Sequence, residues 1–190
     1  HNLQGKFIAL YAGAHGLSND LGVVLEAARQ LRQHPKIAFV LLGDGKEKPN
    51  LIAKAQAMGL SNVHFLPPVS KNEMPDALAA ADAGIGILKP IELYKTTYPN
   101  KVFDYLAAGR PVVLAIDGVI RQVVEAAGAG IPVPPGDPAA MAAALLELAQ
   151  HPEKGRDMGR RARQYVETHF DRARLADQLA DLLVALVGKP

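Results

Sequence analysis

The sequence predicts an α/β fold in which a doubly wound, parallel sheet of about six strands carries helices on both faces. The first observation behind this prediction is a series of short apolar runs of strand length. The second is that longer segments with apolar residues at helical spacing separate these runs. The third is their regular alternation, which is typical of a parallel sheet covered on both sides. Together these patterns predict a doubly wound α/β domain.

Six apolar runs are the predicted strands, and most are followed by Gly, Pro or Asp. They cover residues 6–11, 37–42, 63–65, 83–88, 111–115 and 130–133. The predicted helices cover residues 17–33, 48–58, 71–80, 100–108, 119–126 and 138–150, with two C-terminal helices at 153–168 and 172–187. Asp137 and Pro138 are typical of a capped helix start. In such a sheet, ligands bind outside the carboxyl ends of the strands, where strand order reverses.

Length and composition exclude several classes of protein. At 190 residues and 49% hydrophobic content, we expect a single domain spanning residues 1–190. Twenty-one Lys and Arg against nineteen Asp and Glu are too evenly balanced for a nucleic-acid groove. The absence of cysteine excludes disulfides and thiolate metal sites and fits a reducing cytoplasm. No apolar run approaches the roughly 20 residues that cross a bilayer, so no transmembrane segment is expected.

The turn after the first strand is the first candidate site. Its glycines, Gly13 and Gly16, let backbone N–H groups approach a phosphate, and the next helix start adds partial positive charge. The turn lacks the full spacing of a dinucleotide fingerprint, so an ordinary turn that needs glycine explains it equally well. His15 either donates a hydrogen bond to a phosphate or sugar hydroxyl or lies solvated in the turn. Its position favours the first interpretation.

The turn after the second strand, Gly43-Asp44-Gly45, is the second candidate. The glycines allow the main chain to approach a base, and Asp44 can accept hydrogen bonds from hydroxyl groups. A plain turn explains the segment equally well. An acidic residue at the end of a second strand also fits an NAD-binding domain, so this feature does not discriminate.

The predicted helix 100–108 gives the most informative signal, and Pro99 and Asn100 mark its start. A cation in the first turn of a helix is electrostatically unfavourable unless it binds an anion. We therefore expect Lys101 to contact a ligand phosphate. Asn100 and Asp104 share a helix face, so Asp104 can reach a hydroxyl of the same ligand. The alternative is a solvated helix start with an incidental lysine.

Three segments carry a wider pattern: PNKVFDYLAAGRPVV at 99–113, VVEAAGAGIPVPPGDPAAMAAAL at 123–145 and MGRRARQYVETHF at 158–170. They resemble the C-terminal domain of GT-B glycosyltransferases of family 4, the group 1 glycosyl transferases, and the resemblance runs from about residue 7 to residue 187. It implies a Rossmann-like domain that binds a nucleotide-sugar donor. It also implies that an N-terminal domain, absent from this sequence, holds a sugar or lipid-linked acceptor.

The same resemblance implies a retaining hexosyltransferase of bacterial polysaccharide or glycolipid synthesis, located in the cytoplasm or peripherally at the inner face of the membrane. Such enzymes generally need no cofactor and no bound metal, because protein groups stabilise the charge of the departing diphosphate. The first residue is His1 and not Met, so we expect a piece of a longer protein. The isolated chain is then expected to bind a donor without completing a catalytic site.

The sequence departs from the family pattern at several positions. The family's two acidic residues, eight positions apart, fall on Thr96 and Asp104. The resemblance implies that Asp104 binds the donor ribose, and that Thr96 or Thr97 supplies a hydroxyl in place of the first carboxylate. The family's Arg and Lys near the first helix align with Ala14 and Asn19, so both cations are absent.

A donor diphosphate is costly to desolvate without cationic or N–H partners. Lys101 is the expected replacement for the missing cations, because Pro99-Asn100-Lys101 is similar to a segment found in a subgroup of related transferases. Lys89 and Lys95 are weaker candidates, and we expect both to be solvated.

The segment 63–69 resembles the family segment whose main chain reads the nucleobase edge. The resemblance points to Leu66 for this role, without separating a UDP-type from a GDP-type donor. We expect Phe65 to lie in the core and His64 to be a solvated edge residue.

Two other functions remain open from the sequence. The missing cations and the missing first acidic residue also fit a degenerate or regulatory nucleotide-binding module, or an NAD-type Rossmann domain without transfer chemistry. A UDP-sugar epimerase shares the GT-B fold but needs further acid and base residues, which the sequence does not reveal.

Overall fold

The computed structural model describes residues 3–188, and its strands form one sheet in the order β3-β2-β1-β4-β5-β6. The strands are β1 (Phe7–Ala12), β2 (Ile37–Leu42), β3 (Val63–Leu66), β4 (Ala83–Ile87), β5 (Val112–Ala115) and β6 (Gly130–Pro132), and all pairings are parallel. Strand order reverses between β1 and β4, as in a doubly wound sheet. The predicted fold is confirmed, and each strand differs from its predicted range by at most one residue at either end.

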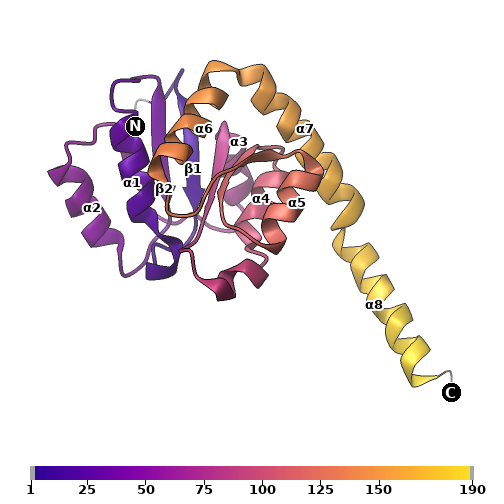
Figure 1. Cartoon of the computed structure of the whole chain (residues 1–190). Coiled ribbons are helices and arrows are strands. Elements are labelled where there is room, and N and C mark those ends of the chain that lie inside the picture. Colours follow the sequence, from indigo (N-terminus) through magenta and orange to yellow (C-terminus); the bar gives the residue numbers. More distant parts are fainter. Residues whose placement is uncertain (1–2, 189–190) are drawn as a thin grey trace.

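Helices cover both faces of this sheet (Figure 1). They are α1 (Leu21–Gln30), α2 (Lys48–Ala57), α3 (Met74–Ala79), α4 (Asn100–Ala107), α5 (Val119–Ala127), α6 (Pro138–Gln150), α7 (Pro152–His169) and α8 (Arg172–Val187). Side chains of α1, α2 and α6 join one apolar core, and those of α3, α4 and α5 join a second core on the other face. Because β2 lies between these two cores, all of its residues are buried and its sequence is continuously apolar.

Two predicted helices begin later than expected. The predicted helix 17–33 is interrupted because Asp20 adopts a left-handed conformation, with φ of 46°, between a short 3-10 turn at Leu17–Asn19 and α1. Short polar side chains tolerate this conformation better than others.

The predicted helix 71–80 begins at Met74, because Pro75 fits the first turn of a helix but not its interior. In contrast, the predicted cap is confirmed, since Asp137 accepts hydrogen bonds from two backbone N–H groups at the start of α6.

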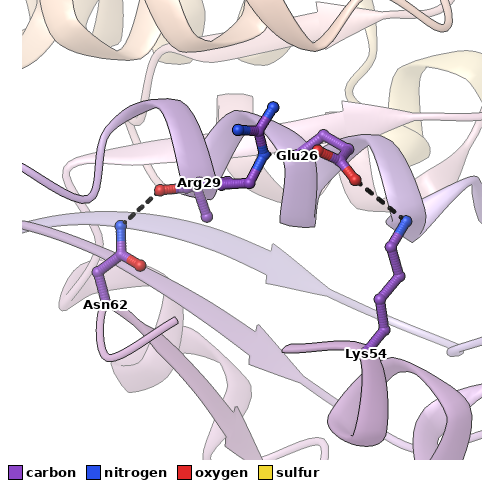
Figure 2. Close-up of polar contacts among 5 residues, drawn as sticks. Glu26, Arg29, Lys54 and Asn62 are labelled. Atoms are coloured by element: carbon purple, nitrogen blue, oxygen red, sulfur yellow. Dashed lines mark hydrogen bonds and ion pairs between the residues drawn. The ribbon is translucent and has the colours of Figure 1, made fainter. Parts of the chain in front are cut away.

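Polar contacts hold α1 over its neighbours (Figure 2). The carboxylate of Glu26 pairs with Arg29 at 2.9 Å and with Lys54 of α2 at 3.4 Å. The amide of Asn62, which is buried, donates a hydrogen bond of 2.9 Å to the carbonyl oxygen of Ala28. Exposed ion pairs contribute little to stability, whereas the loss of a hydrogen bond to a buried amide N–H is costly. Asn62 is therefore the contact that fixes the start of β3 beneath α1.

The C-terminal helices behave differently from each other. α7 packs against α4 and α5, and Phe170 after it contacts Phe103 with ring centroids 4.9 Å apart. α8 projects away from the domain (Figure 1), and residues 171–188 are all exposed. Its exposed apolar side chains include Leu175, Leu179, Leu182, Leu183, Val184, Leu186 and Val187. Within residues 3–188, no helix is long and apolar enough to cross a membrane.

Candidate functional site

The sheet opens at the point where its strand order reverses. β1 pairs with β2 along its whole length, from Phe7 and Ile37 to Ala12 and Leu42, but it pairs with β4 at only two positions. Beyond them, the hydroxyl of Tyr105 accepts a hydrogen bond of 2.8 Å from the backbone N–H of Ala12. This contact ties the buried face of α4 to the carboxyl end of β1.

A pocket of about 400 Å³ lies at this opening, and we call it the switch-point pocket. It is lined by Ala12, Gly13, Asn19, Met74, Leu78, Leu88, Pro99, Asn100, Lys101, Asp104 and Tyr105. It lies at the carboxyl ends of β1 and β4 and at the start of α4, which is the position expected for a ligand in a doubly wound sheet.

Lys101 is the cation of the switch-point pocket. Its ammonium group donates hydrogen bonds to the Tyr11 hydroxyl at 2.7 Å and to Asn19 Oδ1 at 2.9 Å, and it lies 4.1 Å from the centroid of the Tyr11 ring. Among residues 3–188, no carboxylate lies within ion-pair distance of it. Burial lowers the pKa of Lys101 to about 8. The structure therefore holds a half-buried cation against neutral partners, which leaves its charge available to an anion.

The loop after β1 is built around this lysine. Gly13 has φ of 148°, and a Cβ atom there would lie 3.3 Å from the end of the Lys101 side chain. The Tyr11 hydroxyl donates to the carbonyl oxygen of Ala14 at 2.7 Å, and Asn19 Nδ2 donates to the same oxygen at 2.9 Å. A cation at position 19 would repel Lys101, whereas the neutral Asn19 accepts a hydrogen bond from it. The neutral side chain at position 19 thus suits a positive charge at position 101.

Asp104 lies one helical turn after Asn100 and lines the same pocket. Its carboxyl group has no hydrogen-bond partner among residues 3–188, and the residue as a whole is exposed to solvent. Partial burial of that group raises the pKa of Asp104, and the nearby charge of Arg172 opposes this shift. The carboxylate is therefore available to accept hydrogen bonds from hydroxyl groups.

The turn after β2 packs directly on the turn after β1. The N–H of His15 donates to the carbonyl oxygen of Asp44 at 2.7 Å. A Cβ atom at Gly43 would lie 2.0 Å from the carbonyl oxygen of Gly13, and one at Gly45 would lie 2.4 Å from that of His15. The close approach of the two backbones thus accounts for both glycines. The Asp44 side chain accepts from the N–H of Gly45 at 2.8 Å and lies outside the switch-point pocket.

Comparison with known proteins gives the family. The model for the family described as glycosyl transferases group 1 matches residues 6–151. The chain belongs to the group 1 glycosyl transferases. It is 28% identical over 159 residues to D-rhamnosyltransferase WbpZ of Pseudomonas aeruginosa, a match that covers 83% of this chain and 40% of WbpZ.

Two further matches agree with this assignment. The putative colanic acid biosynthesis glycosyl transferase WcaI of Escherichia coli is 30% identical over 178 residues, covering 92% of this chain and 42% of WcaI. The crystal structure of HepE from Anabaena in complex with UDP superposes with a TM-score of 0.86 at 20% identity, covering 96% of this chain and 50% of HepE. This group 1 chain thus spans less than half the length of these curated relatives. The predicted resemblance to part of a GT-B glycosyltransferase is confirmed.

His15 of this group 1 chain does not lie solvated, so that alternative is wrong. Its side chain is fully buried between the rings of Tyr11 and Phe65, with centroids 5.9 Å and 6.2 Å away. Neither ring nitrogen has a hydrogen-bond partner among residues 3–188. Burial, and then the charge of Lys48, lower the pKa of His15, so the ring is neutral at pH 7. The side chain is not part of the lining of the switch-point pocket.

The segment around β3 shows one further correction and one residue that the sequence did not reveal. His64 is half-buried and not solvated, whereas Phe65 packs against the core as predicted. The carbonyl oxygen of Leu66 accepts hydrogen bonds from the N–H of Gly43 at 3.2 Å and from Lys48 Nζ at 3.0 Å. Lys48 also donates to the carbonyl oxygen of Gly43 at 2.6 Å. This lysine holds the ends of β2 and β3 together, and its distance in sequence from Leu66 hid that role.

The remaining predicted residues lie outside the switch-point pocket. The hydroxyls of Thr96 and Thr97 donate to carbonyl oxygens three residues earlier, within and after an unpredicted 3-10 turn at Glu92–Thr96. Gly16 precedes the 3-10 turn at Leu17–Asn19. Of the ten predicted site residues, the structure brings Gly13, Asn100, Lys101 and Asp104 together.

The two weaker lysine candidates also lie outside this group. Lys95 is exposed, as predicted, and pairs with Glu92 at 2.7 Å. Lys89 is half-buried, so the prediction that it is solvated is wrong. Among residues 3–188, no three His, Cys, Asp or Glu side chains gather closely enough to hold a metal ion.

Proposed function

We propose that this chain is the C-terminal, donor-binding domain of a two-domain GT-B glycosyltransferase that transfers a sugar from a nucleoside diphosphate sugar. The observation that carries the proposal is Lys101, a half-buried cation with no anionic partner among residues 3–188, at the mouth of a doubly wound sheet. The family assignment supports it. Further support comes from HepE, which shares the fold and was solved with UDP and with UDP-glucose.

In this proposal, the donor diphosphate binds against Lys101 and the free N–H groups of the first turn of α4. The positive end of the helix and the lysine both favour negative charge there. When the sugar leaves, the same groups stabilise the charge that develops on the departing diphosphate, which is electrostatic catalysis by positioned donors. Asp104 accepts hydrogen bonds from hydroxyls of the donor ribose. Neither a metal nor a cofactor is part of this proposal.

The finer assignments rest on the family. We propose a retaining hexosyl transfer, with a sugar or lipid-linked acceptor held by an N-terminal half that this sequence lacks. The isolated chain then binds the donor but does not turn it over. The name of WcaI, a putative colanic acid biosynthesis enzyme, supports a role in bacterial polysaccharide or glycolipid synthesis. For the whole protein, such a role fits a location in the cytoplasm or peripherally at the inner face of the membrane.

Calorimetric titration of the chain with UDP, GDP, ADP and NAD tests the proposal. We expect UDP or GDP to bind, and Lys101→Met to weaken that binding by about tenfold or more, because it removes a charge-assisted hydrogen bond. The matched control is Lys71→Met, which removes an exposed lysine outside the switch-point pocket.

Two results would count against the proposal. Binding of NAD without binding of UDP or GDP would favour the NAD-type alternative. Equal loss of affinity in Lys101→Met and Lys71→Met would show that the diphosphate does not lie against Lys101.

A further inference from the structure

A second pocket, of about 580 Å³, lies at the amino ends of the strands, whereas the switch-point pocket lies at their carboxyl ends. Its lining includes Phe7, the first residue of β1, and Asp82 and Pro111, which directly precede β4 and β5. These residues mark the amino ends of the strands. The proposed donor site lies at the carboxyl ends, so a ligand here is a separate one.

Four arginine side chains line this second pocket, which we call the arginine pocket: Arg110, Arg156, Arg160 and Arg163. The last three lie on α7 at spacings of four and three residues, which places them on one face of that helix. Arg161 of the same helix instead donates to the carbonyl oxygen of Gly128, outside this pocket.

The guanidinium groups of the arginine pocket make few strong hydrogen bonds or ion pairs within the chain. Arg163 pairs with Glu167 at 2.8 Å and Arg160 pairs with Asp157, but all four side chains of these pairs are more than half exposed, so neither pair contributes much. Arg156 has no hydrogen-bond or ion-pair partner among residues 3–188.

Arg110 is the most buried of the four arginines, and it faces the pocket from the segment after α4. Its Nη2 donates to the carbonyl oxygen of Ala79 at 2.6 Å. Its Nε is buried and has no hydrogen-bond partner among residues 3–188. A buried donor without a partner is costly, and because this Nε has almost no accessible surface, a ligand in the pocket reaches the Arg110 guanidinium through its other nitrogens.

We propose that the arginine pocket binds a phosphate-bearing ligand. The pocket holds four guanidinium groups against two carboxylates, those of Asp82 and Glu167. Asp157, which is not in the lining, pairs with Arg160 and leaves about one positive charge in excess. A phosphate monoester carries about −1.5 to −2 charges at pH 7 and three acceptor oxygens, so it is attracted to this excess. Arginine forks also bind phosphate through paired hydrogen bonds. Phe7, Pro111 and Leu148 supply an apolar wall for the rest of the ligand.

Two sources can supply this phosphate: a free phosphate ester and the headgroup of an anionic lipid. The probes are inorganic phosphate, pyrophosphate and glycerol 3-phosphate in calorimetry, and vesicles of phosphatidylglycerol or phosphatidylcholine in flotation assays. Citrate serves as the carboxylate control. All measurements use a Lys101→Met background, so that phosphate binding at the switch-point pocket does not interfere.

Phosphate binding is compared between two double variants, each of which loses two positive charges. Arg156→Gln/Arg163→Gln changes exposed side chains of the arginine pocket, whereas Lys46→Gln/Lys71→Gln changes exposed lysines outside it. We expect the first to weaken phosphate binding by about tenfold or more and the second to change it by about twofold or less. Circular dichroism melts check that both variants fold.

Hydrogen exchange with the tightest probe locates the site. We expect protection at residues 109–111 and 155–163. Saturable binding of a soluble probe identifies a free ester, and retention on phosphatidylglycerol vesicles alone identifies a lipid headgroup. The proposal is overturned if no probe binds, if both double variants lose binding equally, if citrate binds as tightly as phosphate, or if protection appears elsewhere.

Discussion

Lys101 carries a charge that changes close to neutral pH. Burial lowers its pKa from an ordinary 10.5 to about 8, so it is mostly protonated at pH 7 and mostly neutral above pH 9. Only the protonated form attracts a diphosphate. We therefore expect the affinity for UDP or GDP to fall by about tenfold or more between pH 7 and pH 9.5. Calorimetry across this range measures the effect, and Lys101→Met should bind weakly with little dependence on pH. A wild-type affinity that stays constant to pH 9.5 would contradict this account.

His15 makes the domain sensitive to acid. Its pKa is lowered below the ordinary value of 6.5 by burial, so the folded chain resists protonation while the unfolded chain accepts a proton below pH 6.5. The stability contributed by the neutral ring is present above pH 6.5 and is lost as the pH falls toward the folded pKa. We expect the free energy of unfolding in urea to fall between pH 7.5 and pH 5.5, and to fall less in His15→Phe.

The exposed His151 provides the control for His15. Its replacement, His151→Gln, should leave the full pH dependence in place. Some dependence should remain in His15→Phe, because burial lowers the pKa of His64 as well. An identical loss of stability in wild type and His15→Phe would show that His15 is not the acid-sensitive group.

At the level of elements, two glycines one turn apart on α7 make a matched test of helix packing. A Cβ atom at Gly159 would lie 2.0 Å from the carbonyl oxygen of Gly109, whereas a Cβ atom at Gly155 would meet only ordinary contacts at 3.7 Å and 3.9 Å. We expect Gly159→Ala to lower the free energy of unfolding by about 1–3 kcal/mol through overpacking. Gly155→Ala should be neutral or stabilise by up to about 1 kcal/mol through helix propensity. Chemical denaturation measures both, and equal effects would refute the close contact.

The strands and most helices were predictable because their signals are local. Apolar runs, Gly and Pro punctuation and the Asp137 cap each act within a few residues. The errors lie where packing decides: Asp20 breaks the first helix with a left-handed conformation, and no local pattern showed the 3-10 turn at Glu92–Thr96. Similarly, Lys101 could be predicted from an unfavourable charge at a helix start. Its partners Tyr11 and Asn19 could not, because they lie more than 80 positions away along the chain.

For the molecule as a whole, α8 contributes little to the folded domain. All described residues from 171 onward are exposed, so a chain that ends at Asp171 loses no buried residue. We expect this truncation to change the free energy of unfolding by about 0.5 kcal/mol or less. A chain that ends at Val166 also loses Phe170, which packs on Phe103, and should be less stable by about 2 kcal/mol or more. Urea denaturation of both truncations measures the difference, and a large loss at Asp171 would contradict the structure.

The weak pairing of β1 with β4 also bears on how the chain folds. The strands β1 to β3 and the strands β4 to β6 each come from one continuous stretch of sequence, so each half of the sheet assembles through crossovers between strands that are consecutive in the chain. The join between the halves brings together Ile8 and Asp82, which are 74 positions apart, through a hydrogen bond of 2.8 Å. Closing a long loop costs entropy before its contacts form. We therefore expect the union of two preformed halves to limit the folding rate.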